Sequence, residues 1–220
     1  MTNPSNHQLL RIGAVILAAG EGSRLGGVPK CLISVNGQTL MSRLVHAMQA
    51  MGMARIMVVT GYHSAPVEAA LASLPVEIVH NPDPSAGQQS SVRLGLKALG
   101  AARSMRAVER SAEPGIGREE LSELISAYRH RPQGACIVMP EVDGQRGNPV
   151  VFDGVLIREL LTQALPGGLR GFIDSHPEQV CRMVTGNPNF TLDLDTREDL
   201  EKFARASGVE VCWPEPGSGR

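Results

Sequence analysis

The sequence predicts a single α/β domain, a Rossmann-like three-layer sandwich built on a mostly parallel sheet. Short apolar runs typical of buried strands alternate with segments whose apolar residues recur at helical spacing, which implies right-handed crossovers between parallel strands. A glycine-rich loop directly follows the first predicted strand. The length of 220 residues and the 42% hydrophobic content suit one sizeable core better than two small ones.

The first part of the chain has a regular β-α-β-α-β order. Residues 13–18 form a short apolar run that ends in the glycine-rich loop, and this predicts a fully buried strand rather than an amphipathic helix. Further on, Leu40, Leu44 and Met48 recur at helical spacing after a turn at Asn36-Gly37. The other predicted elements of this part are a helix over residues 39–51, a strand over 54–60, a helix over 65–73 and a strand over 76–79.

The second part of the chain is regular except in one segment. Residues 100–117 include Arg106, Glu109 and Arg110, which a strand covered on both faces does not accommodate, so we interpret the segment as either a distorted strand or a loop. Asp143-Gly144 is a hairpin signal. Helices are predicted within residues 85–99, 118–128 and 153–164, and strands over 135–139 and 180–184.

Composition limits the partners and the compartment. A formal net charge of -1 gives no global basic field, and aromatic content is only 3%, so nucleic acid is not expected as a partner. Four scattered cysteines without a CxxC pair argue against zinc and against a disulfide framework, which favours a reducing cytoplasm. We expect no signal peptide and no membrane span. The predicted boundaries are an N-terminal extension of residues 1–11, a domain of 12–207 and a flexible, Pro- and Gly-rich tail of 208–220.

The loop after the first strand combines glycines with cations. Gly20, Gly22 and the pair Gly26-Gly27 let the backbone turn sharply and approach a ligand, while Arg24 and Lys30 supply positive charge. We expect Lys30 to be a solvated loop cation. Leu25 occupies a position where a dinucleotide fingerprint needs glycine, and Cys31 follows Lys30 where a P-loop needs Ser or Thr, so neither of those phosphate motifs fits.

The loop resembles the signature loop of the MobA-like nucleotidyltransferases. This resemblance implies a fold of the nucleotide-diphospho-sugar transferase type. The matching residues are Leu17, Ala18, Ala19, Gly20, Ser23, Arg24, Leu25, Gly26 and Lys30. This resemblance implies catalytic roles for Arg24 and Lys30 on the triphosphate. It implies a nucleotide-binding role for Leu17, Ala18, Ala19, Gly20, Gly22 and Ser23. In the family, L-A-A-G is usual for cytidylyltransferases and L-A-G-G for guanylyltransferases, so Ala19 favours CTP.

Two later segments extend the resemblance. Gly87, Ser90 and Ser91 are similar to the loop and helix that hold the nucleobase, although Ser90 or Ser91 also suits a helix N-cap. The run over residues 146–152 resembles the molybdenum cofactor cytidylyltransferases. It implies that the acceptor is molybdopterin and that a molybdenum hydroxylase or its maturation factor receives the product. The implied acceptor-binding residues are Arg146, Gly147, Asn148 and Pro149.

The acidic positions depart from the family pattern. The family places a magnesium-binding aspartate in a D-x-P motif, where this chain has Ala112, followed by Glu113. A second family motif, G-D, matches residues 167–172, where no carboxylate stands before Asp174. The closing segment resembles D-(I/L)-D-T-x-E-D-L, in which Thr196 and Asp199 also form a capping box. The candidate ligands for Mg²⁺, or for Mn²⁺, are Glu113, Asp193 and Asp195.

Three functions remain open from the sequence. One is transfer of CMP from CTP to molybdopterin with release of pyrophosphate. Another is a nucleotide- or cofactor-binding homologue with impaired chemistry that acts in molybdoenzyme maturation, which the missing acids favour. The last is a pyrophosphorylase for a different phosphorylated acceptor.

Overall fold

The computed structural model describes residues 11–53, 55–100, 105–162 and 167–214. Its main sheet has eight strands in the order β10-β7-β9-β6-β1-β4-β5, with β8 paired to β7. Within it β1 pairs in parallel with β4 and β6, and β9 runs antiparallel to β6 and β7. The strands are β1 (Arg11–Ala18), β4 (Arg55–Thr60), β5 (Glu77–His80), β6 (Met105–Ser111), β7 (Ile137–Val142), β8 (Gln145–Arg146), β9 (Val150–Phe152) and β10 (Val180–Val184).

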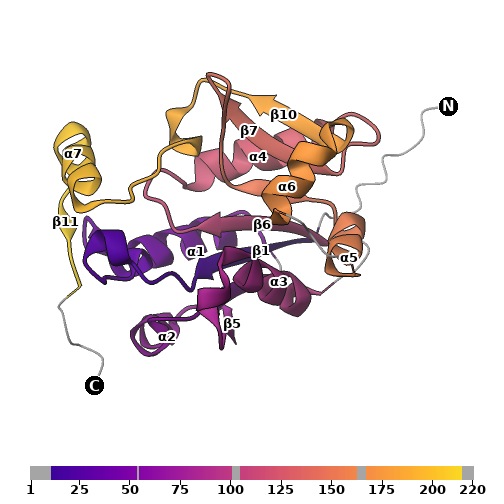
Figure 1. Cartoon of the computed structure of the whole chain (residues 1–220). Coiled ribbons are helices and arrows are strands. Elements are labelled where there is room, and N and C mark those ends of the chain that lie inside the picture. Colours follow the sequence, from indigo (N-terminus) through magenta and orange to yellow (C-terminus); the bar gives the residue numbers. More distant parts are fainter. Residues whose placement is uncertain (1–10, 54, 101–104, 163–166, 215–220) are drawn as a thin grey trace.

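Helices cover both faces of the sheet, as the alternation along β1 shows. Ala14 and Ile16 of β1 belong to a core formed with α1, α2, α4 and α7, whereas Val15 and Leu17 belong to a second core formed with α3, α5 and α6. Figure 1 shows β1 and β6 at the centre of this arrangement. The three-layer α/β fold with a mostly parallel sheet is therefore confirmed. The helices are α1 (Leu40–Ala50), α2 (Ser64–Leu71), α3 (Gln88–Leu99), α4 (Arg118–His130), α5 (Gly154–Thr162), α6 (Gly168–Ser175) and α7 (Arg197–Ser207).

The irregular segment before Gly117 is a strand over most of its length. Met105–Ser111 form β6 and pair with β1 along seven residues, so the chain keeps a central strand despite three charged residues in its sequence. The loop alternative is therefore wrong for this part. Residues 101–104 lie outside the described residues. Since the register sets Leu17 of β1 beside Ser111, the strand delivers Ala112 and Glu113 to the sheet edge where the glycine-rich loop begins.

Local signals account for several element ends. The hairpin predicted at Asp143-Gly144 joins β7 to β8, and both residues have positive φ. The capping box of α7 is confirmed, since the Thr196 hydroxyl accepts from the Asp199 backbone N–H and the Asp199 carboxylate accepts from the Thr196 backbone N–H. The helix predicted over 153–164 is α5, and the structure adds α6, which the sequence pattern did not indicate.

Two predicted ends of the chain differ from the structure. Arg11, assigned to the N-terminal extension, begins β1, while residues 1–10 lie outside the described residues. Residues 208–214 are not a loose tail, because Val211–Cys212 form β11, which pairs with β2 (Ser34–Val35) beside β3 (Gln38–Thr39). In Figure 1, α7 and β11 lie together at one end of the molecule. Within the part of the chain that the structure describes, no helix is long and apolar enough to cross a bilayer.

Candidate active site

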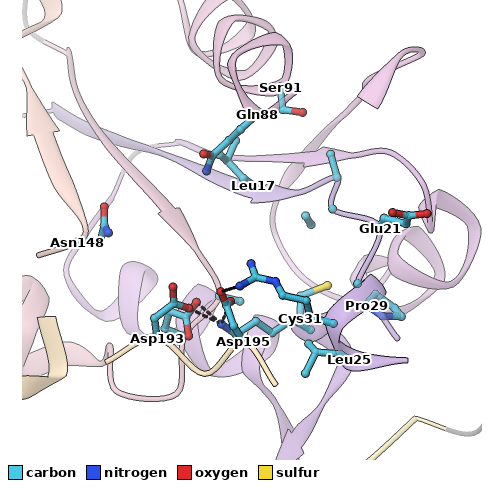
Figure 2. A pocket seen from close by; sticks show the side chains of 18 of the residues that line it. Leu17, Glu21, Leu25, Pro29, Cys31, Gln88, Ser91, Asn148, Asp193 and Asp195 are labelled. Carbon is cyan, nitrogen blue, oxygen red and sulfur yellow. Dashed lines mark hydrogen bonds and ion pairs between the residues drawn. The ribbon is translucent and has the colours of Figure 1, made fainter. Parts of the chain in front are cut away.

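A cavity of about 770 Å³ opens where β1 and β6 end, and most of the predicted site residues line it. Figure 2 shows Asp193 and Asp195 on one side of this pocket and Gln88 and Ser91 on the opposite side. Ligands of parallel α/β sheets bind at this end of the strands. The predicted residues that line the cavity are Leu17, Ala18, Ala19, Gly20, Gly22, Ser23, Arg24, Lys30, Gly87, Ser91, Glu113, Arg146, Asn148, Asp193 and Asp195.

The glycine-rich loop is held in shape by its own backbone. Gly22 has a φ of 70°, and a Cβ there would lie 2.2 Å from the carbonyl oxygen of Val28, so only glycine fits. The Gly22 carbonyl accepts from the N–H groups of Leu25 at 2.8 Å and Gly27 at 2.9 Å. A ring nitrogen of His63, next to α2, lies 2.7 Å from the Glu21 carbonyl oxygen. These contacts fix the backbone that carries Arg24, and the Arg24 side chain is 70% exposed.

Lys30 lies among three carboxylates rather than in open solvent. Its ammonium forms an ion pair with the Glu113 carboxylate, and it lies 3.1 Å from Asp193 Oδ1 and 3.6 Å from Asp195 Oδ1. Asp195 also pairs with Arg24. Side-chain exposure is 17% for Lys30 and 4% for Glu113. The structure therefore brings together both predicted cations and all three predicted acids, and the expectation of a solvated Lys30 is wrong.

These acids surround an ammonium and do not form a preassembled metal site. Over the described ranges, no three His, Cys, Asp or Glu side chains are grouped so that they could hold a metal ion. Ala112, at the family's aspartate position, is buried and lines the cavity. The Cys31 thiol that follows Lys30 is no nucleophile, because burial raises its pKa to about 12.

The opposite side of the cavity is formed by the start of α3. The helix begins at Gln88 with Gly87 as N-cap, so the alternative that Ser90 or Ser91 caps it is wrong. Instead, the Asn81 amide nitrogen donates to the hydroxyls of Ser90 at 2.8 Å and Ser91 at 2.9 Å. Gly87 has a φ of 91°. This network orients the turn between β5 and α3 toward the cavity, which Gly87, Gln88 and the buried Ser91 line.

The predicted acceptor segment lies between two cavities. The Gly147 N–H donates to the Pro140 carbonyl and the Asn148 N–H to the Phe190 carbonyl, each at 2.8 Å. A Cβ on Gly147 would meet Phe190 and Pro140 at 2.9 Å, which explains the glycine. An adjoining cavity of about 1040 Å³ shares with the first Gly87, Gln88, Arg146, Asn148 and Arg170.

Some predicted residues lie elsewhere, and some lining residues were missed. Ser90 and Pro149, both within the described part of the chain, line neither cavity, and Gly147 lines only the second. Asp174, the first carboxylate after the G-D position, pairs with Arg146. Glu21, Tyr62, Gln88 and Arg170 also line the cavity and were not predicted from the sequence. Tyr62 could have been predicted to line the site, because it comes two residues after β4, a parallel neighbour of β1 that ends at the same edge of the sheet.

Known proteins resemble this chain in sequence. A model of the MobA-like NTP transferase domain matches residues 14–180. The chain is similar to the nicotine blue oxidoreductase of Paenarthrobacter nicotinovorans, with 29% identity over 199 residues that cover 87% of this chain and 96% of that protein. It is also similar to the 2-C-methyl-D-erythritol 4-phosphate cytidylyltransferase of Saccharopolyspora erythraea, with 43% identity over 90 residues that cover 40% of each chain.

Solved structures share the fold. Rv0371c of Mycobacterium tuberculosis superposes with a TM-score of 0.71 at 20% sequence identity, covering 89% of this chain and 98% of that one. A complex of Rv0371c with manganese has a TM-score of 0.66 at the same identity, covering 89% and 99%. Because the family model spans most of this chain, the chain belongs to the MobA-like NTP transferase domain family, a family of nucleotidyltransferases.

Proposed function

We propose that this protein transfers CMP from CTP to the phosphate of molybdopterin and releases pyrophosphate. One observation carries the proposal: a single cavity joins the cationic loop of Arg24 and Lys30, the α3 edge at Gly87 and Ser91, and the acceptor segment at Arg146. Each group matches one part of the reaction, namely the triphosphate, the base and the acceptor.

The reaction asks the protein mainly for positioning and charge. An oxygen of the acceptor phosphate attacks the α-phosphorus of CTP, and the bond from that phosphorus to the leaving pyrophosphate breaks. Arg24 can hold two phosphate oxygens through its planar guanidinium, and Lys30 brings a point charge near the reacting phosphate. Backbone N–H groups between Gly20 and Ser23 complete the cradle. Such arrangements lower the barrier by holding the reactants in line and by stabilising charge that develops between them.

Two observations support cytidine as the base. Ala19 stands in the L-A-A-G form of the loop and lines the cavity. The relative with 43% identity over 90 residues is named as a cytidylyltransferase.

The adjoining cavity supports a bulky acceptor. Met139, Phe152 and Ile173 give it an apolar part, and Gln89 and Gln145 add amide groups that suit a heterocycle. Arginine side chains stand where the two cavities meet, as a phosphate between them requires: these are Arg146 and Arg170. In this proposal a molybdenum hydroxylase or its maturation factor receives the product.

A divalent ion and a compartment belong to the same proposal. Asp193 and Asp195 offer hard oxygen donors at the rim of the cavity, and Mg²⁺ or Mn²⁺ needs only one or two protein carboxylates when phosphate oxygens and water complete its shell. Such an ion would supply charge neutralisation on the phosphates. A cytoplasmic location suits the four free thiols, Cys31, Cys136, Cys181 and Cys212.

Pyrophosphate release tests the proposal directly. The purified protein is incubated with CTP, Mg²⁺ and molybdopterin, with parallel reactions that lack the acceptor or contain GTP. Acceptor-dependent release with CTP supports the proposal. Release only with a small acceptor such as 2-C-methyl-D-erythritol 4-phosphate would favour a pyrophosphorylase of different specificity instead.

Ala112 favours a second candidate function. The family's metal-binding aspartate is absent, and a relative that covers 87% of this chain is named as an oxidoreductase. A nucleotide-binding protein that performs redox chemistry or no chemistry would keep the phosphate loop and lose the transfer. A larger melting shift with NADH than with CTP, together with no pyrophosphate release, would favour this candidate.

A further inference from the structure

Glu113 is a carboxylate at the floor of the candidate active site that is almost fully buried. The residue is 5% exposed, although it lines the cavity with one edge. It follows β6 by two positions, where the strand ends beside the glycine-rich loop. An ionised carboxylate so far from water needs a close partner, because a buried charge without one is strongly destabilising.

Two groups of the site provide that partner. Lys30 donates to Glu113 Oε1, and the backbone N–H of Leu194 lies 3.5 Å from Oε2. Glu113 thereby ties the end of the phosphate loop to the segment that carries Asp193 and Asp195. The three segments that meet here lie near the beginning, in the middle and near the end of the sequence.

The ammonium of Lys30 lies close to all three acids. Its Nζ contacts Glu113 from one side and lies within 3.6 Å of oxygens of Asp193 and Asp195. Of the three acids, Glu113 has the least exposed side chain, at 4% against 65% for Asp193 and 30% for Asp195. A metal ion in the cavity therefore reaches Asp193 and Asp195 at the rim more readily than Glu113 at the floor.

We infer that Glu113 is a positioning residue for Lys30 and not a metal ligand. It holds the ammonium at the floor of the cavity, so that the charge faces the reacting phosphate, and the more exposed Asp193 and Asp195 are the candidate ligands of a divalent ion. This inference rests on the proposed nucleotidyl transfer and differs from the sequence-based prediction that Glu113 is a metal ligand. A lysine fixed by a buried anion loses little conformational freedom when the reaction begins, and small misplacements of such groups cost about 10²-fold in rate.

A double-mutant cycle tests the role. Glu113→Gln keeps the shape of the side chain and removes its charge, so we expect kcat to fall about tenfold to a hundredfold while the KM for CTP does not rise. In the Lys30→Met background the same change should alter kcat less than about twofold, because the positioned group is gone. The Mg²⁺ concentration for half-maximal rate should stay within about twofold of wild type.

The opposite results would overturn the inference. A metal ligand would make Glu113→Gln raise the half-saturating Mg²⁺ concentration about tenfold or more, and its effect on kcat would persist with Met at position 30. Glu119→Gln, on the exposed side of α4, is the matched control and should change neither quantity.

A second measurement does not depend on activity. Acylation of lysines followed by mass spectrometry should label Lys30 slowly in the wild-type protein, fastest after Glu113→Gln, which removes the charge, and at an intermediate rate after Glu113→Asp, whose carboxylate is one methylene farther away. Lys97 and Lys202 should be labelled at unchanged rates. Unchanged labelling of Lys30 in folded variants would sink the inference even if CTP is a substrate. Faster labelling combined with no pyrophosphate release from wild type would retain the Glu113–Lys30 contact and reject the proposed function.

Discussion

The glycine-rich loop and the acidic segments that face it are built by different means. In the loop, hydrogen bonds between near neighbours set most of the backbone, as between Gly22 and both Leu25 and Gly27, and His63 adds a contact from outside the loop. The acidic side is assembled from residues 113 and 193–195, which the tertiary fold brings to Lys30 across separations of 83 and 163 positions. The shape of the loop is therefore determined locally, whereas the arrangement of the acidic residues depends on the placement of β6 and of the segment before α7.

The acidic segment around Asp193 is held by contacts to distant parts of the chain. The loop before Asp193 is fastened to α4, where the Glu120 carboxylate accepts from the amides of Asn187 at 3.1 Å and Asn189 at 2.7 Å. The next turn is fastened to the acceptor segment through the Phe190 carbonyl. The acidic region therefore stays in place through partly buried polar contacts, and its position depends on them.

The largest expected effect is the loss of activity when the loop cation Lys30 is removed. Lys30→Met should lower kcat about 10²-fold to 10³-fold, since a fixed charge beside the reacting phosphate is removed. Pyrophosphate release with CTP and molybdopterin measures it, and Lys97→Met, an exposed lysine of α3, is the control. A fall of equal size in the control, or none in Lys30→Met, would mean that the loop does not carry the chemistry.

The next effect distinguishes the two cations of the loop by stability. Lys30→Met strands the buried Glu113 carboxylate, so we expect the free energy of unfolding to fall by about 2 to 3 kcal/mol. Arg24 is 70% exposed, and Arg24→Met should cost below about 1 kcal/mol. Urea unfolding measures both. Lys30→Met combined with Glu113→Leu should recover most of the loss, and failure to recover it would show that the cost does not come from the stranded charge.

A smaller effect concerns the base. If Ala19 and the α3 edge favour cytidine, CTP should raise the melting temperature more than GTP does, because the tighter ligand stabilises the native state further. A tenfold difference in Kd corresponds to about 1.4 kcal/mol. For a chain of this length that is roughly 3 to 6 °C. A larger shift with GTP would reverse the assignment of the base.

The smallest effect concerns pH and the anchor of the acidic region. Burial raises the pKa of Glu120, but hydrogen bonds from Asn189, Asn187 and backbone N–H groups outweigh it and hold the pKa below its ordinary value of 4.5. Because the folded-state value is the lower one, the anchor stabilises the protein fully above that ordinary value and loses its contribution as pH falls through the folded-state pKa. Urea midpoints between about pH 5 and pH 3 should therefore fall less steeply for Glu120→Gln than for wild type. Parallel slopes for the two proteins would contradict the anchor.

The sequence by itself determined the regular parts of the protein. The apolar run before Gly20, the helical spacing of Leu40, Leu44 and Met48, and the Asp143-Gly144 turn each encode their element through neighbours close in the chain, and the structure has all three. The glycine-rich loop could be predicted for the same reason. Periodicity failed at residues 105–111, because pairing with β1 and β9 holds a strand that its charged residues disfavour.

Only the tertiary structure decided the charge environment of the site. Nothing near Lys30 in the sequence indicates that it pairs with Glu113, and nothing near Val211 indicates that this residue pairs with Val35 rather than belonging to a loose tail. Burial and ion pairing depend on which distant segments share an edge of the sheet, a property of the strand order and not of any local window. The same reason distinguishes the acids by exposure: packing buries Glu113 and leaves Asp193 and Asp195 more exposed, so the sequence could name the three together but could not tell them apart.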